Sequence, residues 1–174
     1  GCIPSKALLH TAAIINEAEH MKSNGVDFGK PKIKLDGING FKDKVVGKLT
    51  GGLRQLAKQR KVEVVTGVSE FIDANNLRVV NDGKEIAIRF EHGIVAAGSR
   101  VTQIPSFPYD DKRLMDSTGA LELNNVPSKL LIIGGGIIGL EMATVYHALG
   151  SEITVVEFMD SLIPGCDKDL VRPL

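Results

Sequence analysis

The stretch Lys129–Glu157 constrains the fold of this chain more than any other part. An apolar run at 130–133 leads into GGGIIG, a glycine spacing of the form G-x-G-x-x-G, and a helical apolar pattern follows until Gly150. A second apolar run at 153–156 ends in the acid Glu157. The order strand, glycine turn, helix, strand and acid is that of a βαβ unit that binds a dinucleotide. The spaced glycines are Gly134, Gly136 and Gly139, and the expected inner face of the helix contains Ile138, Met142, Val145 and Leu149.

Each spaced glycine and the acid have a physical role in such a unit. Gly134 allows the tight turn out of the strand, Gly136 lets a pyrophosphate approach the backbone, and Gly139 lets the helix pack closely on the sheet. The N–H groups at the start of the helix would bind the phosphates. Glu157 lies 18 residues after Gly139, which suits a carboxylate that accepts hydrogen bonds from ribose hydroxyls. The alternative is a glycine-rich turn that binds no nucleotide.

Glu157 also predicts which dinucleotide binds. Its negative charge would repel the 2′-phosphate of NADP, and an NADP site normally supplies an arginine near this point. The residues that follow are Phe158, Met159 and Asp160, and the next basic residue is Lys168. The sequence therefore favours NAD over NADP.

Composition and charge exclude several other classes. The 21 basic and 21 acidic residues cancel, so nothing favours nucleic acid or a membrane surface as a partner. The longest strongly apolar run, 130–140, is too short to span a bilayer, and no signal peptide is visible. Cys2 and Cys166 do not make a secreted disulfide scaffold, and the four histidines show no metal-ligand spacing with them, so no metal site is predicted. We expect a cytoplasmic protein.

Two helices are predicted in the first 60 residues. Pro4 suits the first turn of a helix that ends at Asn24-Gly25. Cys2 would then lie at its N-terminus, where the helix dipole favours the nucleophilic thiolate, with a buried structural cysteine as the alternative. A long amphipathic helix is predicted from Ile38 to Leu56. The glycines inside it indicate either a close approach by another backbone or a helix break at the turn Thr50-Gly51-Gly52.

Short strands are predicted between residues 62 and 97. Asn81-Asp82-Gly83 predicts a hairpin turn, and the alternation of apolar residues at 86, 88 and 90 predicts a strand with one buried face. The run 94–97 predicts a buried strand, and the small residues after it would let a ligand approach the backbone. A short helical turn is predicted at 117–121. The expected strands are 62–65, 68–72, 77–80, 85–90 and 94–97.

Six motifs occur in the order found in one enzyme family. GCIPSK, LTGGL, AAGSR, DSTGAL, GGGIIGLE and VVE together resemble the flavoprotein disulfide reductases, and within them the dihydrolipoamide dehydrogenases of bacterial type. GCIPSK resembles the second half of the redox-active C-x-x-x-x-C motif. The resemblance implies an α/β fold class, with FAD- and NAD(P)-binding Rossmann-like domains and a small antiparallel β-meander, incomplete at both ends. Residues 1–104 would be the C-terminal part of the FAD-binding domain, and residues 105–174 the N-terminal part of the NAD-binding domain.

The same resemblance implies a mechanism and a set of site residues. Dihydrolipoamide would reduce an enzyme disulfide, electrons would pass to FAD, and hydride would pass to NAD⁺. Cys2 resembles the redox-active cysteine nearer the flavin, with its partner cysteine upstream of Gly1. Lys6 resembles the lysine beside the flavin, and Glu141 the acid that pairs with it. The implied FAD contacts are Lys6, Ser69 (where the family commonly has glycine), Ala97, Gly98 and Ser99. The implied NAD contacts are Gly134, Gly135, Gly136, Ile137, Ile138, Gly139, Leu140, Glu141 and Glu157.

The resemblance also implies partners and leaves alternatives open. The expected partners are dihydrolipoamide on the E2 lipoyl domain, the E2 core of a 2-oxo-acid dehydrogenase complex, and a second copy in a homodimer. The fragment alone is expected to be inactive. One alternative is another flavoprotein disulfide reductase of glutathione or mercuric reductase type, against which Glu157 argues because both usually use NADP. Another is a non-catalytic fragment that binds a nucleotide or a partner. Cys166 lacks a partner at motif spacing and is expected to be incidental.

Overall fold

The computed structural model describes residues 1–174, which form two compact units. The first unit contains residues 1–49 and 103–174, and the second contains residues 50–102. These units are defined by contacts within this chain. The expected boundary at residue 104 between two nucleotide-binding domains therefore stays a prediction.

The two predicted N-terminal helices are present. Helix α1 (Cys2–His20) continues into the short 3₁₀ helix η1 (Met21–Asn24), which ends at Gly25 with a φ of 87°. Helix α2 (Leu35–Gln59) runs without interruption, so the alternative of a break at Thr50-Gly51-Gly52 is wrong. No helix combines the length and the apolar character needed to cross a membrane.

The predicted βαβ unit is formed. Strand β4 (Lys129–Ile133) leads into helix α4 (Ile137–Ala148), and Gly150, with a φ of 113°, separates the helix from strand β5 (Glu152–Val156). The two strands pair in parallel, in a register that aligns Lys129 with Glu152 and Ile133 with Val156. Because parallel neighbours need a crossover connection, α4 is what allows these strands to lie side by side.

Two short helices flank the βαβ unit in the chain. Helix α3 (Ser117–Glu122) is capped by Asp116, whose Oδ1 accepts hydrogen bonds from the N–H groups of Thr118 and Gly119, both at 2.9 Å. Such a cap satisfies N–H groups that have no acceptor within the helix. Helix α5 (Lys168–Val171) follows β5.

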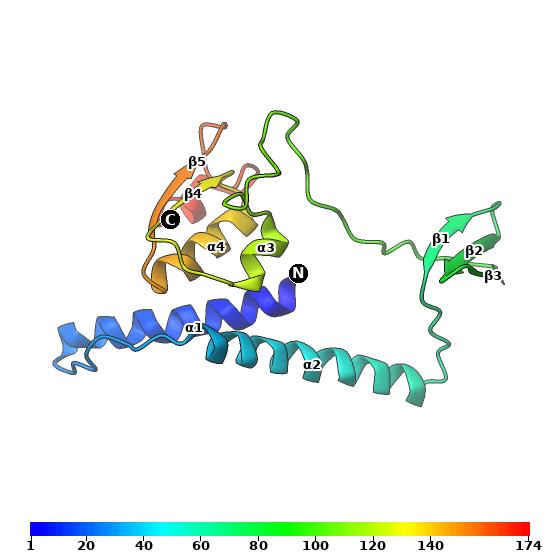
Figure 1. The fold of residues 1–174 in the computed structure, drawn as a ribbon, viewed down its shortest axis with the longest axis horizontal. Coiled ribbons are helices and arrows are strands. Elements are labelled where there is room, and N and C mark those ends of the chain that lie inside the picture. Colours follow the sequence, from blue (N-terminus) through cyan, green and yellow to red (C-terminus); the bar gives the residue numbers. More distant parts are fainter. The chain divides into compact units, whose positions relative to one another are not determined.

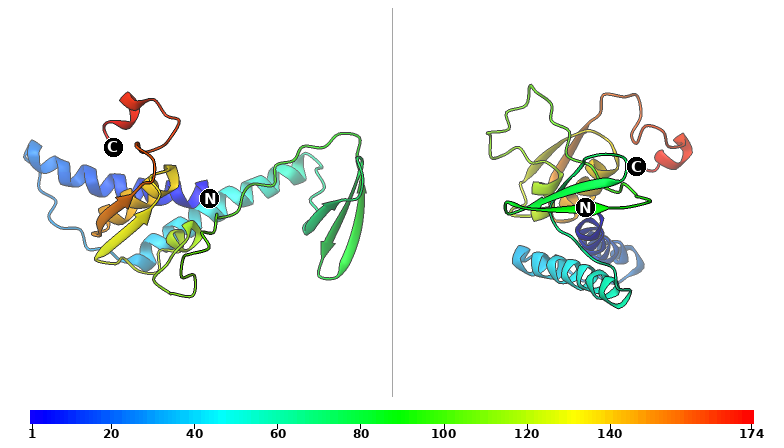
Figure 2. Two further views of the ribbon diagram at one scale, coloured as in Figure 1. Left: turned by 90° about the horizontal axis from the view of Figure 1, so that it is seen from above. Right: turned by 90° about the vertical axis from the view of Figure 1, so that its right-hand side faces the viewer.

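Helix α4 lies between the β4–β5 pair and helix α1, as Figures 1 and 2 show. Its expected inner face is only partly right, because Ile138 is 57% exposed whereas Tyr146 is fully buried and donates a hydrogen bond to the Ala120 carbonyl at 2.9 Å. Gly139 rather than Ile138 faces strand β4, so the side chain of Ile138 points elsewhere. The buried core consists of Leu8, Ala120, Leu123, Met142, Val145 and Tyr146.

A buried lysine joins the start of α2 to the end of α3. Lys42 is 8% exposed, and its Nζ donates to the Leu121 carbonyl at 2.8 Å and to Oδ1 of Asn39 at 2.9 Å. Nδ2 of Asn39 donates to the Leu123 carbonyl at 3.2 Å. These side chains therefore satisfy carbonyl groups at the C-terminus of α3, which the helix itself leaves without donors.

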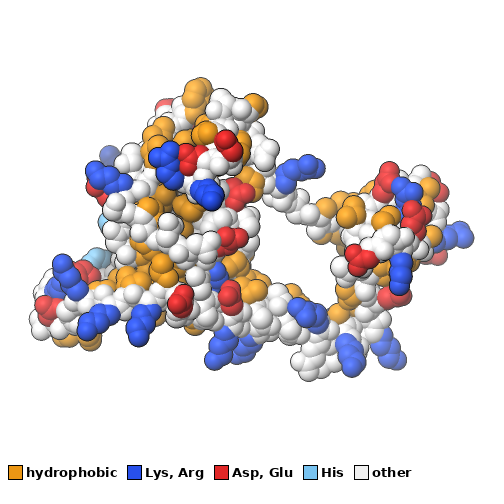
Figure 3. Space-filling view, viewed as in Figure 1, with side chains coloured by type: hydrophobic (Ala, Val, Ile, Leu, Met, Phe, Trp, Pro, Cys, Tyr) orange, Lys and Arg blue, Asp and Glu red, His pale blue; other side chains and the backbone are white.

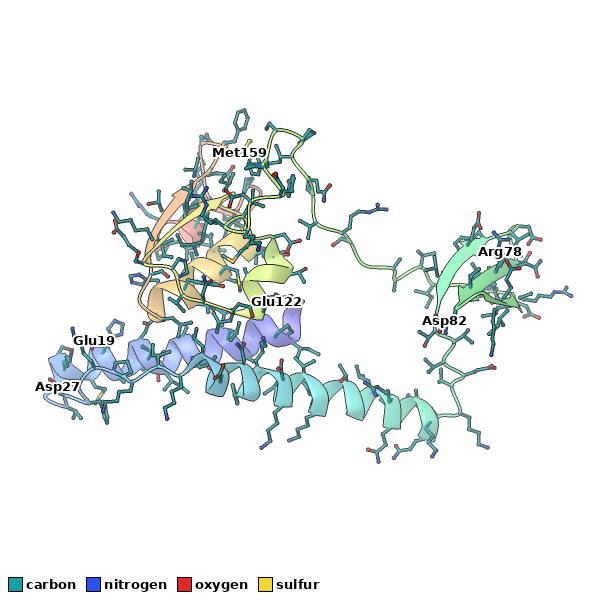
Figure 4. All side chains as sticks on the ribbon, viewed as in Figure 1. Glu19, Asp27, Arg78, Asp82, Glu122 and Met159 are labelled. Atoms are coloured by element: carbon teal, nitrogen blue, oxygen red, sulfur yellow. The ribbon has the colours of Figure 1, made fainter.

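The second unit contains the predicted antiparallel meander. Strands β1 (Val68–Phe71), β2 (Asn76–Asn81) and β3 (Lys84–Arg89) pair in the order β1-β2-β3. The predicted hairpin turn is confirmed: Asp82 and Gly83 have φ values of 48° and 76°, as a type I′ turn requires. Arg78, which is labelled in Figure 4, lies on the central strand and forms ion pairs with Glu70 at 2.7 Å and Glu85 at 3.7 Å.

Two other predicted strands of this unit are absent. Residues 62–65 and 94–97 have no regular secondary structure, and Ile94 and Val95 are 97% and 74% exposed, so the prediction of a buried strand at 94–97 is wrong in this structure. A strand needs a neighbour for its backbone N–H and C=O groups, and the meander pairs with neither segment. Ile86 is 46% exposed, so β3 also lacks its expected buried face. Hydrophobic side chains remain at the surface of this unit (Figure 3).

Candidate active site

The redox candidate Cys2 is the first residue of helix α1. It is exposed and makes no disulfide, so the alternative of a buried structural cysteine is wrong. At this position its sulfur lies where the helix dipole stabilises negative charge. Its reactivity stays a prediction. Cys166 is also exposed and unpaired, in a turn where its N–H donates to the Ile163 carbonyl at 3.1 Å.

Helix α1 is joined to helix α4 by a cluster of three polar side chains. Lys6 forms an ion pair with Oε1 of Glu141, and the Ser5 hydroxyl donates to the other oxygen, Oε2, at 2.6 Å. The Glu141 side chain is 18% exposed and that of Lys6 64% exposed. The pairing of Lys6 with Glu141, which the family resemblance implied, is therefore present. Their catalytic roles stay predictions.

Both members of this ion pair are stabilised in their charged forms. Burial raises the pKa of Glu141, but the hydrogen bonds from Lys6 and Ser5 and the charge of Lys6 outweigh it, so its pKa is lowered. The hydrogen bond to Glu141 raises the pKa of Lys6 against the effect of burial, and the electrostatic interactions with Glu141 and Cys2 raise it further. Lys6 lies one helical turn after Cys2, so its positive charge is close to the thiol.

Ser5 was not among the residues that the sequence predicted for the site. It is buried, at 4% exposed, although serine is usually exposed. Its position inside GCIPSK gives no spacing signal of its own. Only the packing of α1 on α4 brings its hydroxyl to a carboxylate that lies 136 residues away in the chain.

The glycine turn between β4 and α4 has the geometry that the motif predicts. Gly134 has a φ of 107°, and a Cβ on Gly139 would lie 2.3 Å from the Gly134 carbonyl oxygen. The space beside Gly136 is open. The first helical bond runs from the Leu140 N–H to the Gly136 carbonyl at 3.1 Å, so the N–H groups of residues 137–139 have no acceptor within the helix. Open space beside free donors fits a pyrophosphate.

Glu157 contacts the glycine turn directly. Its Oε2 accepts a hydrogen bond from the Gly135 N–H at 2.6 Å, and its Oε1 accepts one from the Met159 N–H at 2.8 Å. These hydrogen bonds from backbone N–H groups lower the pKa of Glu157, and the one from Met159 has the larger effect. Burial opposes them with a smaller effect. Met159 is labelled in Figure 4, beyond the end of β5. From the sequence, Glu157 was expected to contact a ribose, and its contact with the turn was not predicted.

The segment after β5 also lies against the turn. The N–H of Ile163 donates to the Gly135 carbonyl at 2.9 Å, and a Cβ on Gly135 would lie 2.4 Å from Cδ2 of Leu162. Ile163 has a φ of 44°, which is rare for a β-branched residue. No motif marks this segment, so neither contact could be found from spacing.

The residues expected to contact FAD are distributed over both units. Lys6 belongs to the first unit. In the second, Ser69 lies in β1 opposite Val79, while Ala97, Gly98 and Ser99 are exposed and irregular, with a φ of 71° at Gly98. Two surface hollows, of about 560 Å³ near Tyr109 and about 470 Å³ near Cys166, contain none of the predicted site residues.

Comparisons with known proteins agree with this geometry. Residues 1–173 match the family model described as pyridine nucleotide-disulphide oxidoreductase. Dihydrolipoyl dehydrogenase of Haemophilus influenzae is 55% identical over 172 residues, which cover 98% of this chain and 36% of the relative. The chain thus spans about a third of the length of the curated relatives that it matches.

Solved structures resemble the fold over nearly the whole chain. The HOCl-induced flavoprotein disulfide reductase RclA from Escherichia coli has a TM-score of 0.73 and 30% identity, over 99% of this chain and 35% of that protein. LpdA from Mycobacterium tuberculosis has a TM-score of 0.80 at 22% identity, over 99% of this chain and 38% of that protein, and bears on the fold alone. With the family model matched from end to end and the glycine turn and Lys6–Glu141 pair in place, the chain belongs to the pyridine nucleotide-disulphide oxidoreductase family.

Proposed function

We propose that this protein is a dihydrolipoyl dehydrogenase. It oxidises dihydrolipoamide to lipoamide, and the two electrons reduce NAD⁺ to NADH with release of a proton. The observation that carries the proposal is the contact of Glu141, in the nucleotide helix α4, with Ser5 and Lys6 in the cysteine helix α1. The contact holds helix α1, which begins with the candidate redox cysteine Cys2, against helix α4, which begins at the glycine turn expected to bind NAD⁺. The 55% identity to a protein of this name supports the choice of substrate.

The residues of α1 would act on the dithiol substrate. Cys2, the exposed first residue of α1, would be one half of a redox-active disulfide, with Lys6 one helical turn after it. Glu141, anchored by Ser5, would hold Lys6 in place. FAD, when bound, would carry two electrons between the disulfide and NAD⁺. The residues proposed to hold FAD are Lys6, Ser69, Ala97, Gly98 and Ser99.

The glycine turn and Glu157 would bind NAD⁺. The open space beside Gly136 would admit the pyrophosphate, and the N–H groups at residues 137–139 would hydrogen-bond to it. Glu157 would accept hydrogen bonds from the adenosine ribose, and its charge would repel the 2′-phosphate of NADP. An E2 lipoyl domain as substrate carrier, an E2 core and a homodimer as partners, and a cytoplasmic location stay predictions.

The proposal is tested in the protein as its gene encodes it. We expect dihydrolipoamide-dependent reduction of NAD⁺, with NADP⁺ a much poorer acceptor. Cys2→Ser should lower kcat by about a thousandfold or more, because it removes the nucleophile. Cys166→Ser is the matched control and should leave kcat unchanged. A preference for NADP⁺, or equal losses in the two variants, would contradict the proposal.

A further inference from the structure

Gly135 is the one residue of the glycine turn whose N–H and C=O groups are both bound by the segment that follows β5. Its N–H donates to Oε2 of Glu157 at 2.6 Å, and its carbonyl accepts from the Ile163 N–H at 2.9 Å. The side chain of Leu162 covers the same residue, since its Cδ2 would lie 2.4 Å from a Cβ on Gly135. Segment 157–163 therefore contacts the turn at Gly135 through two hydrogen bonds and a side chain, while the space beside Gly136 stays open.

The Glu157 carboxylate is engaged without any nucleotide. One oxygen binds the Gly135 N–H, and the other binds the Met159 N–H at 2.8 Å. A carboxylate oxygen has two acceptor positions, so each oxygen can still accept a hydrogen bond from a ribose hydroxyl. The bonds within the protein and those to a ribose are therefore compatible and not alternatives.

We propose that Glu157 is a positioning residue for the glycine turn, in addition to its expected contact with the ribose. By binding the Gly135 N–H, it fixes the turn in the conformation that leaves Gly136 accessible before the nucleotide arrives. A loop that is already ordered loses less conformational entropy on binding, so the nucleotide binds more tightly. This inference rests on the proposed function only for the identity of the nucleotide.

The proposal has a consequence for cofactor specificity. A substitution of Glu157 by a basic or apolar residue removes the repulsion of a 2′-phosphate and also removes the acceptor for the Gly135 N–H. Such a variant should therefore lose affinity for NAD⁺ without a matching gain for NADP⁺. The preference for NAD⁺ over NADP⁺ and the fixed conformation of the glycine turn would thus both depend on the side chain of Glu157.

The experiment separates the two roles of Glu157 by removing the ribose contact from the ligand. Binding of NAD⁺, and of an analogue whose adenosine ribose lacks both the 2′- and the 3′-hydroxyl, is measured for the wild type and for Glu157→Met. Methionine has about the size of glutamate but no oxygen that could accept a hydrogen bond from the Gly135 N–H. Glu152→Met is the matched control, because Glu152 is the first residue of β5 and its side chain forms only an exposed ion pair with Lys129 at 3.5 Å.

We expect Glu157→Met to bind the dideoxy analogue about three- to tenfold more weakly than the wild type does, the effect of about one hydrogen bond. Glu152→Met should bind it as the wild type does. Equal affinities of wild type and Glu157→Met for the analogue would overturn the proposal, since Glu157 would then act only through the ribose hydroxyls.

Hydrogen exchange of the Gly135 amide provides a second readout that needs no nucleotide. In the nucleotide-free protein this amide should exchange severalfold faster in Glu157→Met than in the wild type and Glu152→Met. An unchanged exchange rate would overturn the proposal. If the wild type binds no NAD⁺, the proposed function fails, while the exchange measurement still decides whether Glu157 holds the turn.

Discussion

Short apolar runs that predict β-strands occur in both units, but only some of those in the second unit form strands. In the first unit, the apolar runs at 130–133 and 153–156 become the paired strands β4 and β5, with α4 between them in the chain. In the second, the runs at 94–97 and, apart from Glu63, at 62–65 are also apolar but remain irregular and unpaired. An apolar run thus becomes a strand only where the chain supplies a neighbour for it, and in both units the strands that form have that neighbour nearby in sequence.

The largest expected effect comes from truncating one apolar residue in each unit. Leu8 is 1% exposed and Ile94 is 97% exposed. Leu8→Ala should lower the free energy of unfolding by about 3–4 kcal/mol, because it leaves a cavity in the core. Ile94→Ala should change it by less than about 0.5 kcal/mol. Urea denaturation measures both. A large loss for Ile94→Ala in the protein as its gene encodes it would break the comparison and mean that residues outside 1–174 cover this segment.

A smaller loss is expected at the glycine that brings α4 onto β4. A Cβ on Gly139 would lie 2.3 Å from the carbonyl oxygen of Gly134, a backbone atom that cannot rotate away. Gly139→Ala should therefore cost about 2–3 kcal/mol of stability, as overpacking does. Gly136→Ala, where the space is open, should cost less than about 1 kcal/mol in thermal or urea unfolding. Equal losses at the two positions would contradict the close approach.

Helix α2 allows one substitution to be compared in both units. Lys42→Met should cost about 1–2 kcal/mol, because it leaves the Leu121 carbonyl and the Asn39 side chain without their donor. Lys58→Met, near the exposed C-terminal end of the same helix, should change stability by less than about 0.5 kcal/mol. A comparable loss for Lys58→Met would show that the second half of α2 is also packed.

The smallest effect concerns two carboxylates whose pKa is lowered by different means. Ser5→Ala removes one hydrogen bond to Glu141 and should raise the pKa of that carboxyl. The pKa of Asp73, lowered by hydrogen bonds from Asn75 and Asn76 within its own turn, should not change. Carboxyl-carbon NMR titration follows both groups. A shift at Asp73, or none at Glu141, would contradict the assignment.

The sign of the pH dependence follows from the lowered pKa of Glu141. Its contribution to stability is fully present above the ordinary value of 4.5 and is lost as the pH falls through the lower folded value. Wild type should therefore exceed Ser5→Ala in stability at neutral pH. The difference should shrink as the solution is acidified below about pH 4.5.

The sequence predicted the parts of the site that depend on local spacing. Gly134, Gly136 and Gly139 lie within one turn of chain, and backbone geometry alone requires glycine at Gly134 and Gly139. The hairpin at Asp82-Gly83 was predictable for the same reason. The pairing of Lys6 with Glu141 was expected only from the family resemblance, because no local rule relates residues 135 positions apart.

The missed features depend on packing between distant segments or on unmarked loops. Ser5 reaches Glu141 because α1 packs on α4, and the segment after Glu157 folds back onto Gly135 without any motif. The exposure of 94–97 could not be foreseen either, since an apolar run predicts burial but cannot specify what covers it. The inner face of α4 was assigned one position too early at Ile138, because the close contact of Gly139 with β4 sets the rotation of the helix.

The exposed segment 94–97 also bears on how this chain behaves in solution. Its apolar residues are exposed and pair with no strand, so it is one place at which a strand of another molecule can pair. The formal net charge of zero supplies no long-range repulsion between copies. A better-packed core in the first unit would leave this segment exposed and would not remove the tendency of copies to associate through it.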